Sequence, residues 1–166
     1  MSDPDSFDAF YRGTRQRLYD CLYALTGNAA EAQDAAQEAY ARAWQRWSTV
    51  SDYADPEAWV RTVGRRIAVS RWRRMRTALS TDRRAALPHA VAGPEPDSVA
   101  LVAALSRLPL AQRTAIVLHH ISGLPVAEVA REMGVPEGTV KARLSRGRKA
   151  LAELLGMDEP EASHVR

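Results

Sequence analysis

Residues 124–155, LPVAEVAREMGVPEGTVKARLSRGRKALAELL, are typical of two short helices joined by a tight turn. The first part carries apolar residues three and four positions apart, which places them on one face of a helix. Gly134 is expected to end this helix, because glycine adopts the left-handed conformation without a Cβ penalty. Pro136 suits the start of a second helix, since the first turn does not need its missing N–H.

The second predicted helix has an apolar stripe and a one-sided charge. The stripe is expected to consist of Val140, Leu144, Gly147, Leu151 and Leu155. Five basic residues occupy the remaining surface: Lys141, Arg143, Arg146, Arg148 and Lys149. A plain helical hairpin with a solvated cationic face would also fit this pattern. The basic face and the small or polar start, Glu137-Gly138-Thr139, together favour a DNA-binding helix-turn-helix.

Composition limits the classes of protein to which the 166-residue chain can belong. It has one cysteine, Cys21, which excludes an internal disulfide and a multi-cysteine zinc site. Because Cys21 lies among leucines at helical spacing, we expect a buried thiol. No apolar run is long enough to span a bilayer, and the acidic first residues do not form a signal peptide. We therefore expect a cytoplasmic protein without membrane insertion.

The net charge of +3 hides a strong partition along the chain. Residues 1–58 contain five arginines against ten acidic residues, a balance of −5. Residues 59–87 contain nine arginines against one aspartate, a balance of +8, and residues 137–155 contain five basic against two acidic residues, a balance of +3. Two separate basic blocks favour two contacts with a polyanion.

Helix-start signals and a break in periodicity predict an all-α chain of two small helical domains. We expect three helices in the first domain, starting at Asp3-Pro4, Asn28 and Asp55-Pro56 and ending near Gly27, Trp47 and Thr77, with a loop at 48–54. Residues 79–96 lose helical periodicity and contain several prolines, which predicts a flexible linker. The first domain is therefore placed at 1–78.

The second domain is expected to contain four helices within residues 97–155. A short helix capped by Asp97 or Ser98 would run to about Leu108, and Pro109 would break it. A helix over 110–121, ended by Gly123, would precede the hairpin. Residues 156–166 form an acidic tail.

The third predicted helix mixes arginines with an indole ring. Trp72 lies among Arg61, Arg65, Arg66, Arg71, Arg73, Arg74 and Arg76. An indole can stack on an unpaired base while guanidinium groups hold phosphates, which is typical of a nucleic-acid surface. A position of Trp72 in the core fits the pattern equally well.

The hairpin at 126–151 resembles the last domain of bacterial sigma factors of the small extracytoplasmic-function (ECF) class. The matching residues are Glu128, Ala130, Gly134, Gly138, Thr139, Val140, Lys141, Arg143, Leu144 and Arg146. Response-regulator output domains share a similar pattern, so this half alone does not separate the two classes. Pro125 stands where the family usually has a serine or threonine, so we expect this helix to lack its side-chain cap.

Residues 34–44, DAAQEAYARAW, resemble the most recognisable sigma-factor segment, in which Asp34, Gln37, Glu38 and Tyr40 match. In the family this helix binds the clamp helices of the RNA polymerase β′ subunit, so the resemblance assigns these four residues to core-polymerase binding. Residues 56–76 resemble the promoter-opening segment, with Arg66 and Ser70 where the family usually has Asn and Asp.

The resemblance covers roughly residues 7–155 and is to group 4 (ECF) sigma factors of actinobacterial type. It implies a non-enzymatic promoter-specificity subunit without cofactor or metal. Its partners would be core RNA polymerase, through the β′ clamp helices and the β flap, promoter DNA and an anti-sigma factor. The implied minus-ten contacts are Arg61, Arg65, Arg66, Trp72, Arg73, Arg74 and Arg76. The implied minus-thirty-five contacts are Glu137, Gly138, Thr139, Lys141, Arg143, Ser145 and Arg146.

Two other classes of function are weighed against this one. A stand-alone DNA-binding regulator would leave the segment at 34–44 without a role. An enzyme would have to use His119-His120, and adjacent residues on a helix diverge by about 100°. No acidic residue or cysteine stands at ligand spacing beside this pair. We therefore expect the two histidines to lie at the edge of the core.

Overall fold

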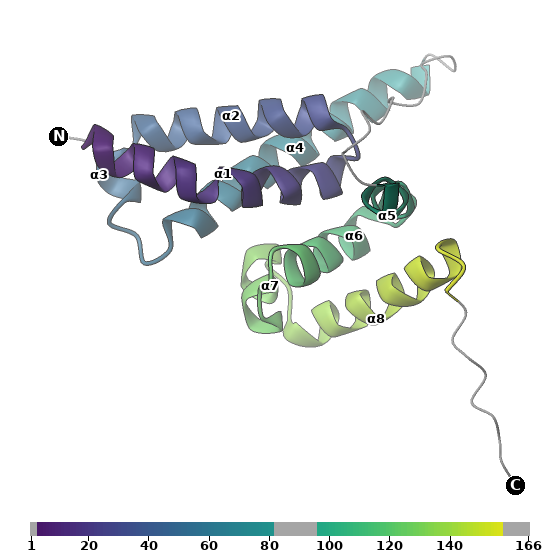
Figure 1. The fold of residues 1–166 in the computed structure, drawn as a ribbon. Helices are drawn as coiled ribbons and strands as arrows, with labels where there is room; N and C mark the ends of the chain where they lie inside the picture. Colours follow the sequence, from purple (N-terminus) through teal and green to yellow (C-terminus); the bar gives the residue numbers. More distant parts are fainter. Residues whose placement is uncertain (1–2, 82–95, 158–166) are drawn as a thin grey trace, which may run out of the picture.

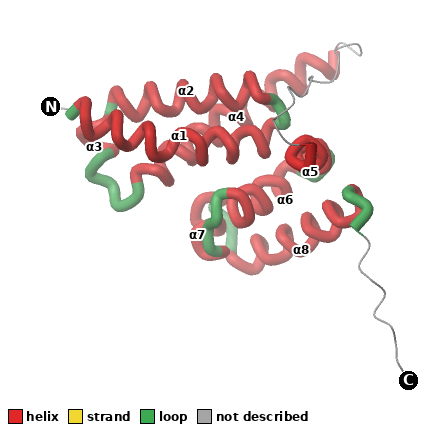
Figure 2. The backbone as a smooth tube through the Cα atoms, viewed as in Figure 1, coloured by secondary structure: helices red, strands yellow, loops and turns green. Residues whose placement is uncertain are grey.

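The computed structural model describes residues 3–81 and 96–157, and all regular elements within these ranges are helices (Figures 1 and 2). The N-terminal bundle consists of α1 (Pro4–Thr26), α2 (Ala29–Gln45), α3 (Trp47–Val50) and α4 (Pro56–Thr81). The C-terminal bundle consists of α5 (Pro96–Ser106), α6 (Leu110–Ile116), the π-helical turn η1 (Val117–Ile121), α7 (Val126–Met133) and α8 (Glu137–Leu154). The predicted all-α class with two helical domains is confirmed.

The helix ends in the N-terminal bundle follow the predicted capping signals. Asp3 Oδ1 accepts a hydrogen bond from the Asp5 amide at 3.1 Å, and Asn28 Oδ1 accepts one from the Glu31 amide at 3.1 Å. Asp55 Oδ1 accepts from the Ala58 amide at 3.0 Å, ahead of α4. Gly27 ends α1 with φ of 66°, a conformation that favours glycine.

Three long helices, α1, α2 and α4, run side by side and share one apolar core (Figure 1). A Cβ atom on Gly64 of α4 would lie 3.2 Å from Leu22 Cδ1 and 3.6 Å from Ala39 Cβ. Glycine at this position therefore lets α4 approach α1 and α2 closely.

The turn after α2 differs from the prediction. The helix ends at Gln45 instead of near Trp47, and α3 occupies part of the segment predicted as a loop at 48–54. Trp47 and Val50 are both buried, and their burial holds this short helix against the bundle. Trp44, which lies one residue before the end of α2, is 42% exposed.

The first two helices of the C-terminal bundle differ from the predicted boundaries. Helix α5 begins at Pro96 and ends at Ser106, so the expected capping residues Asp97 and Ser98 lie inside it. The helix predicted over 110–121 is interrupted, because its last turn is π-helical and the Ser122 amide donates to Val117 O at 2.9 Å. Both ends of the predicted linker are helical, and residues 82–95 lie outside the described ranges.

The helix-turn-helix forms as predicted. Pro125 makes no side-chain cap for α7, and Gly134 ends that helix with φ of 66°. On α8, Val140, Leu144 and Gly147 are buried. Leu155, predicted at the end of the same stripe, is exposed and lies beyond the helix.

The two bundles pack against each other along a contact that we call the interdomain seam. Helix α1 packs against α5 and η1, and Figure 1 shows α5 near the end of α1. Three arginines, Arg61, Arg65 and Arg113, cross the seam with hydrogen bonds. Arg61 of α4 contacts Glu132 of α7, and Arg113 Nη1 of α6 donates to Leu25 O of α1 at 2.8 Å.

Candidate functional site

The acidic face of α2 is formed by three of the four residues predicted there. Asp34 and Gln37 are exposed, whereas Glu38 is partly buried and forms ion pairs with Arg42, at 2.5 Å, and with Arg71 of α4. Because Glu38 lies between two arginines, it joins the acidic face of α2 to the basic surface of α4.

Tyr40, the fourth predicted residue, faces the core. Its side chain is buried, and its hydroxyl lies 2.7 Å from Thr14 Oγ1, which in turn donates to Phe10 O at 2.8 Å. Burial raises the pKa of Tyr40 to about 12. In this arrangement Tyr40 supports the helix, and the face available to a partner consists of its polar neighbours.

The basic surface of α4 divides into two groups. Four arginines are exposed to solvent: Arg66, Arg73, Arg74 and Arg76. The others predicted as DNA contacts, Arg61 and Arg65, turn toward the interdomain seam. The sequence pattern could not separate these groups, because arginines occur on every side of this helix.

Arg61 and Arg65 are held by one residue of the C-terminal bundle. Arg61 Nε and Nη2 donate to Glu132 Oε1 at 2.8 and 2.5 Å, and Arg65 Nη2 donates to Glu132 O at 2.9 Å. Burial opposes the charge on both arginines. The carboxylate of Glu132 outweighs that effect at Arg61, whose pKa is raised, whereas the pKa of Arg65 is lowered.

Trp72 lies at the boundary between the core and the surface. It is partly buried, and its ring lies under the Arg76 guanidinium at 5.0 Å and near the Arg113 guanidinium at 5.7 Å. Contacts of this length are cation–π interactions. Trp72 therefore extends the basic surface of α4 to the edge of the C-terminal bundle.

The outer face of α8 carries the predicted helix-turn-helix residues on the surface. Glu137, Gly138, Lys141, Ser145 and Arg146 are exposed, and Thr139 and Arg143 are partly exposed. The buried stripe is on the opposite side, where a Cβ atom on Gly147 would lie only 2.9 Å from Ile116 Cγ1. None of the α8 cations takes part in the ion pairs found within the described residues.

Arg113 has a structural role that was not predicted from the sequence. It is buried, and its guanidinium donates to four carbonyl oxygens: Leu105 at 2.9 Å, Leu25 at 2.8 Å, Ser106 at 3.3 Å and Leu108 at 3.0 Å. Three of these carbonyls belong to the last turns of α1 and α5. Carbonyl groups in the last turn of a helix have no intrahelical donor, and the negative end of the helix dipole favours a cation there. The signal available in the sequence for this buried role was a single arginine between Leu110 and the apolar run at 115–118.

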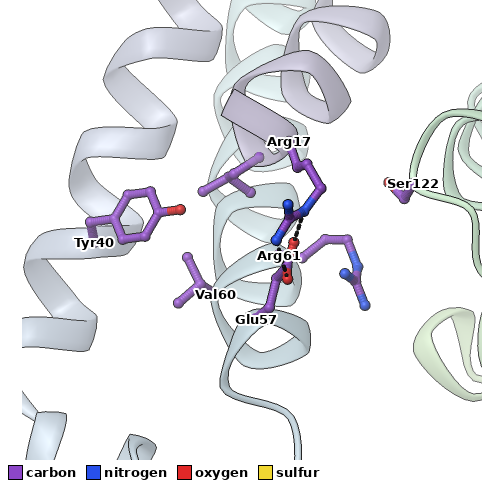
Figure 3. A pocket seen from close by; sticks show the side chains of 7 residues that line it. Arg17, Tyr40, Glu57, Val60, Arg61 and Ser122 are labelled. Atoms are coloured by element: carbon purple, nitrogen blue, oxygen red, sulfur yellow. Dashed lines mark hydrogen bonds and ion pairs between the residues drawn. The ribbon is translucent and has the colours of Figure 1, made fainter. Parts of the chain in front are cut away.

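The cavity shown in Figure 3 lies between the N-terminal bundle and Ser122. It is lined by Arg17, Leu18, Tyr40, Glu57, Val60, Arg61 and Ser122. Arg17 closes one side through two hydrogen bonds to Glu57, at 2.7 and 3.0 Å. Its volume of about 20 Å³ has room for roughly one water molecule. The cavity is therefore too small for an organic substrate.

The two histidines lie where the sequence analysis expected them, at the edge of the core. His119 Nδ1 donates to Leu124 O at 2.7 Å, which uses that nitrogen within the fold, while His120 is exposed. Burial, His119 and Arg148 lower the pKa of His120. Among the described residues, no group of three or more histidine, cysteine or acidic side chains is arranged to hold a metal ion.

Cys21 is buried, as predicted, and burial raises the pKa of its thiol. It lies near the interdomain seam, where the charges of Arg61, Arg65 and Glu132 act on it. Across 3–81 and 96–157, no helix has the length and hydropathy needed to cross a membrane.

Comparison with known families assigns both bundles. Residues 10–77 match the family described as Sigma-70 region 2, and residues 98–151 match the family described as Sigma-70, region 4. The first match covers most of the N-terminal bundle, with the acidic face of α2 and the basic surface of α4. The second covers the helix-turn-helix.

Curated relatives and a solved structure agree with this assignment. The ECF RNA polymerase sigma factor SigL of Mycobacterium tuberculosis is 34% identical over 141 positions, which cover 81% of this chain and 80% of SigL. SigJ of the same species is 33% identical over 170 positions, 93% of this chain, although the chain spans only 53% of SigJ. The sigma factor RpoE of Bartonella quintana, solved with the anti-sigma factor NepR, superposes with a TM-score of 0.82 at 25% identity, covering 93% of this chain and 99% of RpoE.

The separate matches to region 2 and region 4, and the relatives that span both, also decide against a stand-alone regulator. The chain therefore belongs to the ECF RNA polymerase sigma factors, a non-enzymatic family that acts in transcription initiation.

Proposed function

We propose that the chain directs core RNA polymerase to promoters and helps to open them, with each bundle contacting a different partner surface. The observation that carries this proposal is the separation of charge over one chain. An acidic face on α2, a basic surface on α4 and a basic face on α8 are all present, in a family that acts in transcription initiation. Domain limits of 1–78 and 97–155, joined by a linker at 79–96, form part of the proposal.

The acidic face of α2 would bind the clamp helices of the polymerase β′ subunit. Asp34 and Gln37 are free to do so, and Glu38 could exchange its arginines within this chain for arginines of the partner. Tyr40 would act indirectly, by holding α2 against α1 through its hydrogen bond to Thr14. The C-terminal bundle would approach the β flap.

The basic surface of α4 would hold the minus-ten DNA. Arg66, Arg73, Arg74 and Arg76 are exposed and can contact phosphates, while Trp72 can stack on an unpaired base. Arg61 and Arg65 would join them only after leaving Glu132. The exposed residues 51–55 before α4 lie next to this surface in the chain and would assist strand opening.

The outer face of α8 would enter the major groove of the minus-thirty-five element. Helix-turn-helix proteins place the N-terminal residues of the second helix against base edges. Glu137, Gly138, Thr139 and Lys141 would therefore lie nearest the bases. Arg143, Ser145 and Arg146 would contact base edges or phosphates.

An anti-sigma factor is a further proposed partner, and the cytoplasm is the proposed location. The support for the partner is that RpoE, which shares the fold over 93% of this chain, was solved with NepR. The absence of a membrane-spanning helix in the described ranges is compatible with a cytoplasmic polymerase subunit.

The deciding experiment mixes the purified chain with core RNA polymerase, tests for co-elution, and sequences the run-off transcripts from genomic DNA. We expect a complex and discrete start sites, and the Asp34→Lys variant should weaken the complex. Asp20→Lys is the matched control, because Asp20 is also exposed but lies on α1. Specific DNA retention by the chain alone, without a polymerase complex, would contradict the proposal.

A further inference from the structure

A basic pocket lies between α2 and α4, two helices of the N-terminal bundle that run side by side (Figure 1). Its volume is about 280 Å³, close to the lower limit of roughly 300 Å³ for small-molecule sites. Helix α2 contributes Glu38 and Arg42 to its walls, and α4 contributes Arg66, Arg71 and Arg74. Four guanidinium groups against one carboxylate give the pocket a charge balance of +3. The pocket therefore concentrates positive charge in a recess between two helices.

Two of the four arginines already converge on an anion. Arg42 and Arg71 form ion pairs with the same carboxylate, that of Glu38, and reach it from different helices. Each uses Nη2 for this contact, whereas a guanidinium group carries five N–H donors. The side chains of Arg42 and Arg71 are 53% and 33% exposed, so their other donors are accessible to a ligand. This side of the pocket can therefore hold a second anionic group.

The other two arginines have no acidic partner. Arg66 and Arg74 are exposed, and neither takes part in the ion pairs found within the described residues. Arg74 Nη2 donates to Ser70 Oγ at 3.4 Å, and Ser70 also lines the pocket. Guanidinium forks and a hydroxyl group are donors that phosphate oxygens accept. The unpaired charge on α4 therefore suits a phosphate group.

The two positions at which residues 56–76 differ from the usual family residues both line this pocket. Arg66 stands where the family usually has Asn, and Ser70 stands where it usually has Asp. With the usual residues the charge balance of the pocket would be two lower, +1 instead of +3. The excess positive charge therefore comes from residues particular to this chain.

The amount of charge and the shape of the pocket favour the end of a phosphate chain over the backbone of a nucleic acid. A backbone phosphate carries one negative charge, whereas a terminal phosphate group carries about −1.5 to −2 at neutral pH. A chain of two or three phosphates carries more, and so matches a balance of +3. A recess of this size also admits a chain end more readily than a continuous strand.

We propose that the pocket between α2 and α4 binds a short polyphosphate chain, either free or carried by a nucleotide. Arg66 and Arg74 would be its main contacts, and Arg42 and Arg71 would share their donors between the ligand and Glu38. This inference goes beyond the proposed function, because the ligand is neither DNA nor protein. Since Arg66 and Arg74 also belong to the proposed minus-ten contacts, a bound ligand would compete with promoter DNA.

The test is calorimetric titration of the full-length chain with inorganic tripolyphosphate, and separately with ATP and AMP, at an ionic strength of about 0.15 M. We expect saturable binding of one tripolyphosphate per chain and binding of ATP at least ~10-fold tighter than AMP, because charge-assisted hydrogen bonds to the added phosphates are gained. Tripolyphosphate as tight as ATP would identify the free chain as the ligand, and tighter ATP would identify a nucleotide; both support the site. Equal binding of ATP and AMP would overturn the polyphosphate assignment.

Variants of exposed arginines locate the binding. Arg42→Gln on α2 and Arg74→Gln on α4 should each weaken tripolyphosphate binding at least ~10-fold. The matched controls are Arg46→Gln, just after α2, and Arg73→Gln on α4, which remove the same charge outside the pocket. Both should stay within about twofold of the unmodified chain. Equal weakening by pocket and control variants would show general attraction to arginines and overturn the site.

A variant at Ser70 tests the pocket without removing an arginine. Ser70→Asp adds a carboxylate to the pocket and should weaken tripolyphosphate binding at least ~10-fold, whereas Ser70→Asn, of similar size, should weaken it much less. Similar losses in both variants would show that bulk, not charge, is responsible, and would overturn the proposed phosphate contact.

Titration with a single-stranded oligonucleotide separates the ligand from DNA. Arg42→Gln should affect oligonucleotide binding by no more than about twofold, because Arg42 lies outside the proposed minus-ten contacts. Absence of saturable tripolyphosphate binding, with oligonucleotide binding that depends on Arg42, would assign the pocket to the DNA backbone and overturn the proposal. The titrations with phosphates use neither polymerase nor DNA. Failure of run-off transcription would therefore refute the proposed function without changing this result.

Discussion

The interdomain seam and the outer face of α8 both contain arginines, but the two regions use them in opposite ways. At the seam, Arg61 and Arg113 are buried, and protein oxygen atoms accept their hydrogen bonds. On α8, Arg146 and Arg148 are exposed. Arginines in a basic stretch of the sequence can therefore be either buried structural donors or exposed surface charges.

The difference follows from how charge and apolar residues share each helix. On α8 the buried residues Val140, Leu144 and Gly147 form one stripe, which leaves the cations on the opposite side. On α4 the arginines surround the helix, so packing against a second bundle buries some of them. A helix therefore keeps all of its charges available to a polyanion only where its apolar stripe is separate.

The largest expected effect is that of Arg113→Met on stability. The substitution leaves the carbonyls of Leu25 and Leu108 without a donor and removes one of two donors from the carbonyl of Leu105, which keeps the Leu108 amide. We expect a loss of about 3 kcal/mol or more in the free energy of unfolding, since each unpaired buried acceptor costs roughly 1–3 kcal/mol. Urea unfolding measures this loss. Arg107→Met, at an exposed position, should change the free energy by less than about 0.5 kcal/mol. Equal losses of stability in Arg113→Met and Arg107→Met would contradict the distinction between buried and exposed arginines.

The inner face of α8 should be destabilised by added volume, whereas a helix position with open space around it should not. Gly147→Ala places a methyl group 2.9 Å from Ile116 Cγ1, and we expect destabilisation by about 1–3 kcal/mol from overpacking. Gly13→Ala in α1 is the control, because no atom lies within 4 Å of its Cβ position and alanine favours the helix by roughly 0.5–1 kcal/mol. Thermal unfolding measures both changes. A lower midpoint for Gly147→Ala and a higher midpoint for Gly13→Ala would support the close packing of α6 on α8.

The outer face of α8 should affect DNA binding without affecting stability. Arg143→Ala or Arg146→Ala is expected to weaken promoter binding by about 1–3 kcal/mol if the side chain reads a base edge. Arg148→Ala, a neighbouring exposed cation outside the proposed contact set, should reduce binding less and similarly for all sequences. Promoter titrations at fixed salt measure both. Unchanged transcription from a cognate promoter would rule out the assignment of Arg143 and Arg146.

The smallest expected effect is that of Tyr40→Phe, because Tyr40 is a buried polar residue that carries no charge at neutral pH. Tyr40→Phe removes the hydrogen bond to Thr14 and should cost about 0.5–1.5 kcal/mol. Because folding raises the pKa of Tyr40 from about 10 to about 12, its stabilising contribution is complete below pH 10 and is lost as the pH rises toward 12. In an alkaline titration of phenolate absorbance, the transition near pH 12 should be absent from the variant. Persistence of that transition would place the buried phenol elsewhere.

Much of the fold could be predicted because its signals are local. The caps at Asp3, Asn28 and Asp55 and the left-handed glycines at Gly27 and Gly134 each involve residues within a few positions. The errors occurred where tertiary packing overrides periodicity. Part of the predicted loop forms α3, because Trp47 and Val50 are buried against the bundle. The last turn of the helix after Pro109 is π-helical.

For the candidate site, the amino-acid sequence was enough to show which residues carry charge and which helices carry them. It also placed the acidic residues of α2 on one face, because spacings of three and four positions suffice for that. The burial of Tyr40 and the pairing of Arg61 and Arg65 with Glu132 could be seen only in the folded chain. The cause is distance along the chain. Arg61 and Glu132 are 71 positions apart, so no local pattern couples them, and their pairing depends on how the two bundles pack.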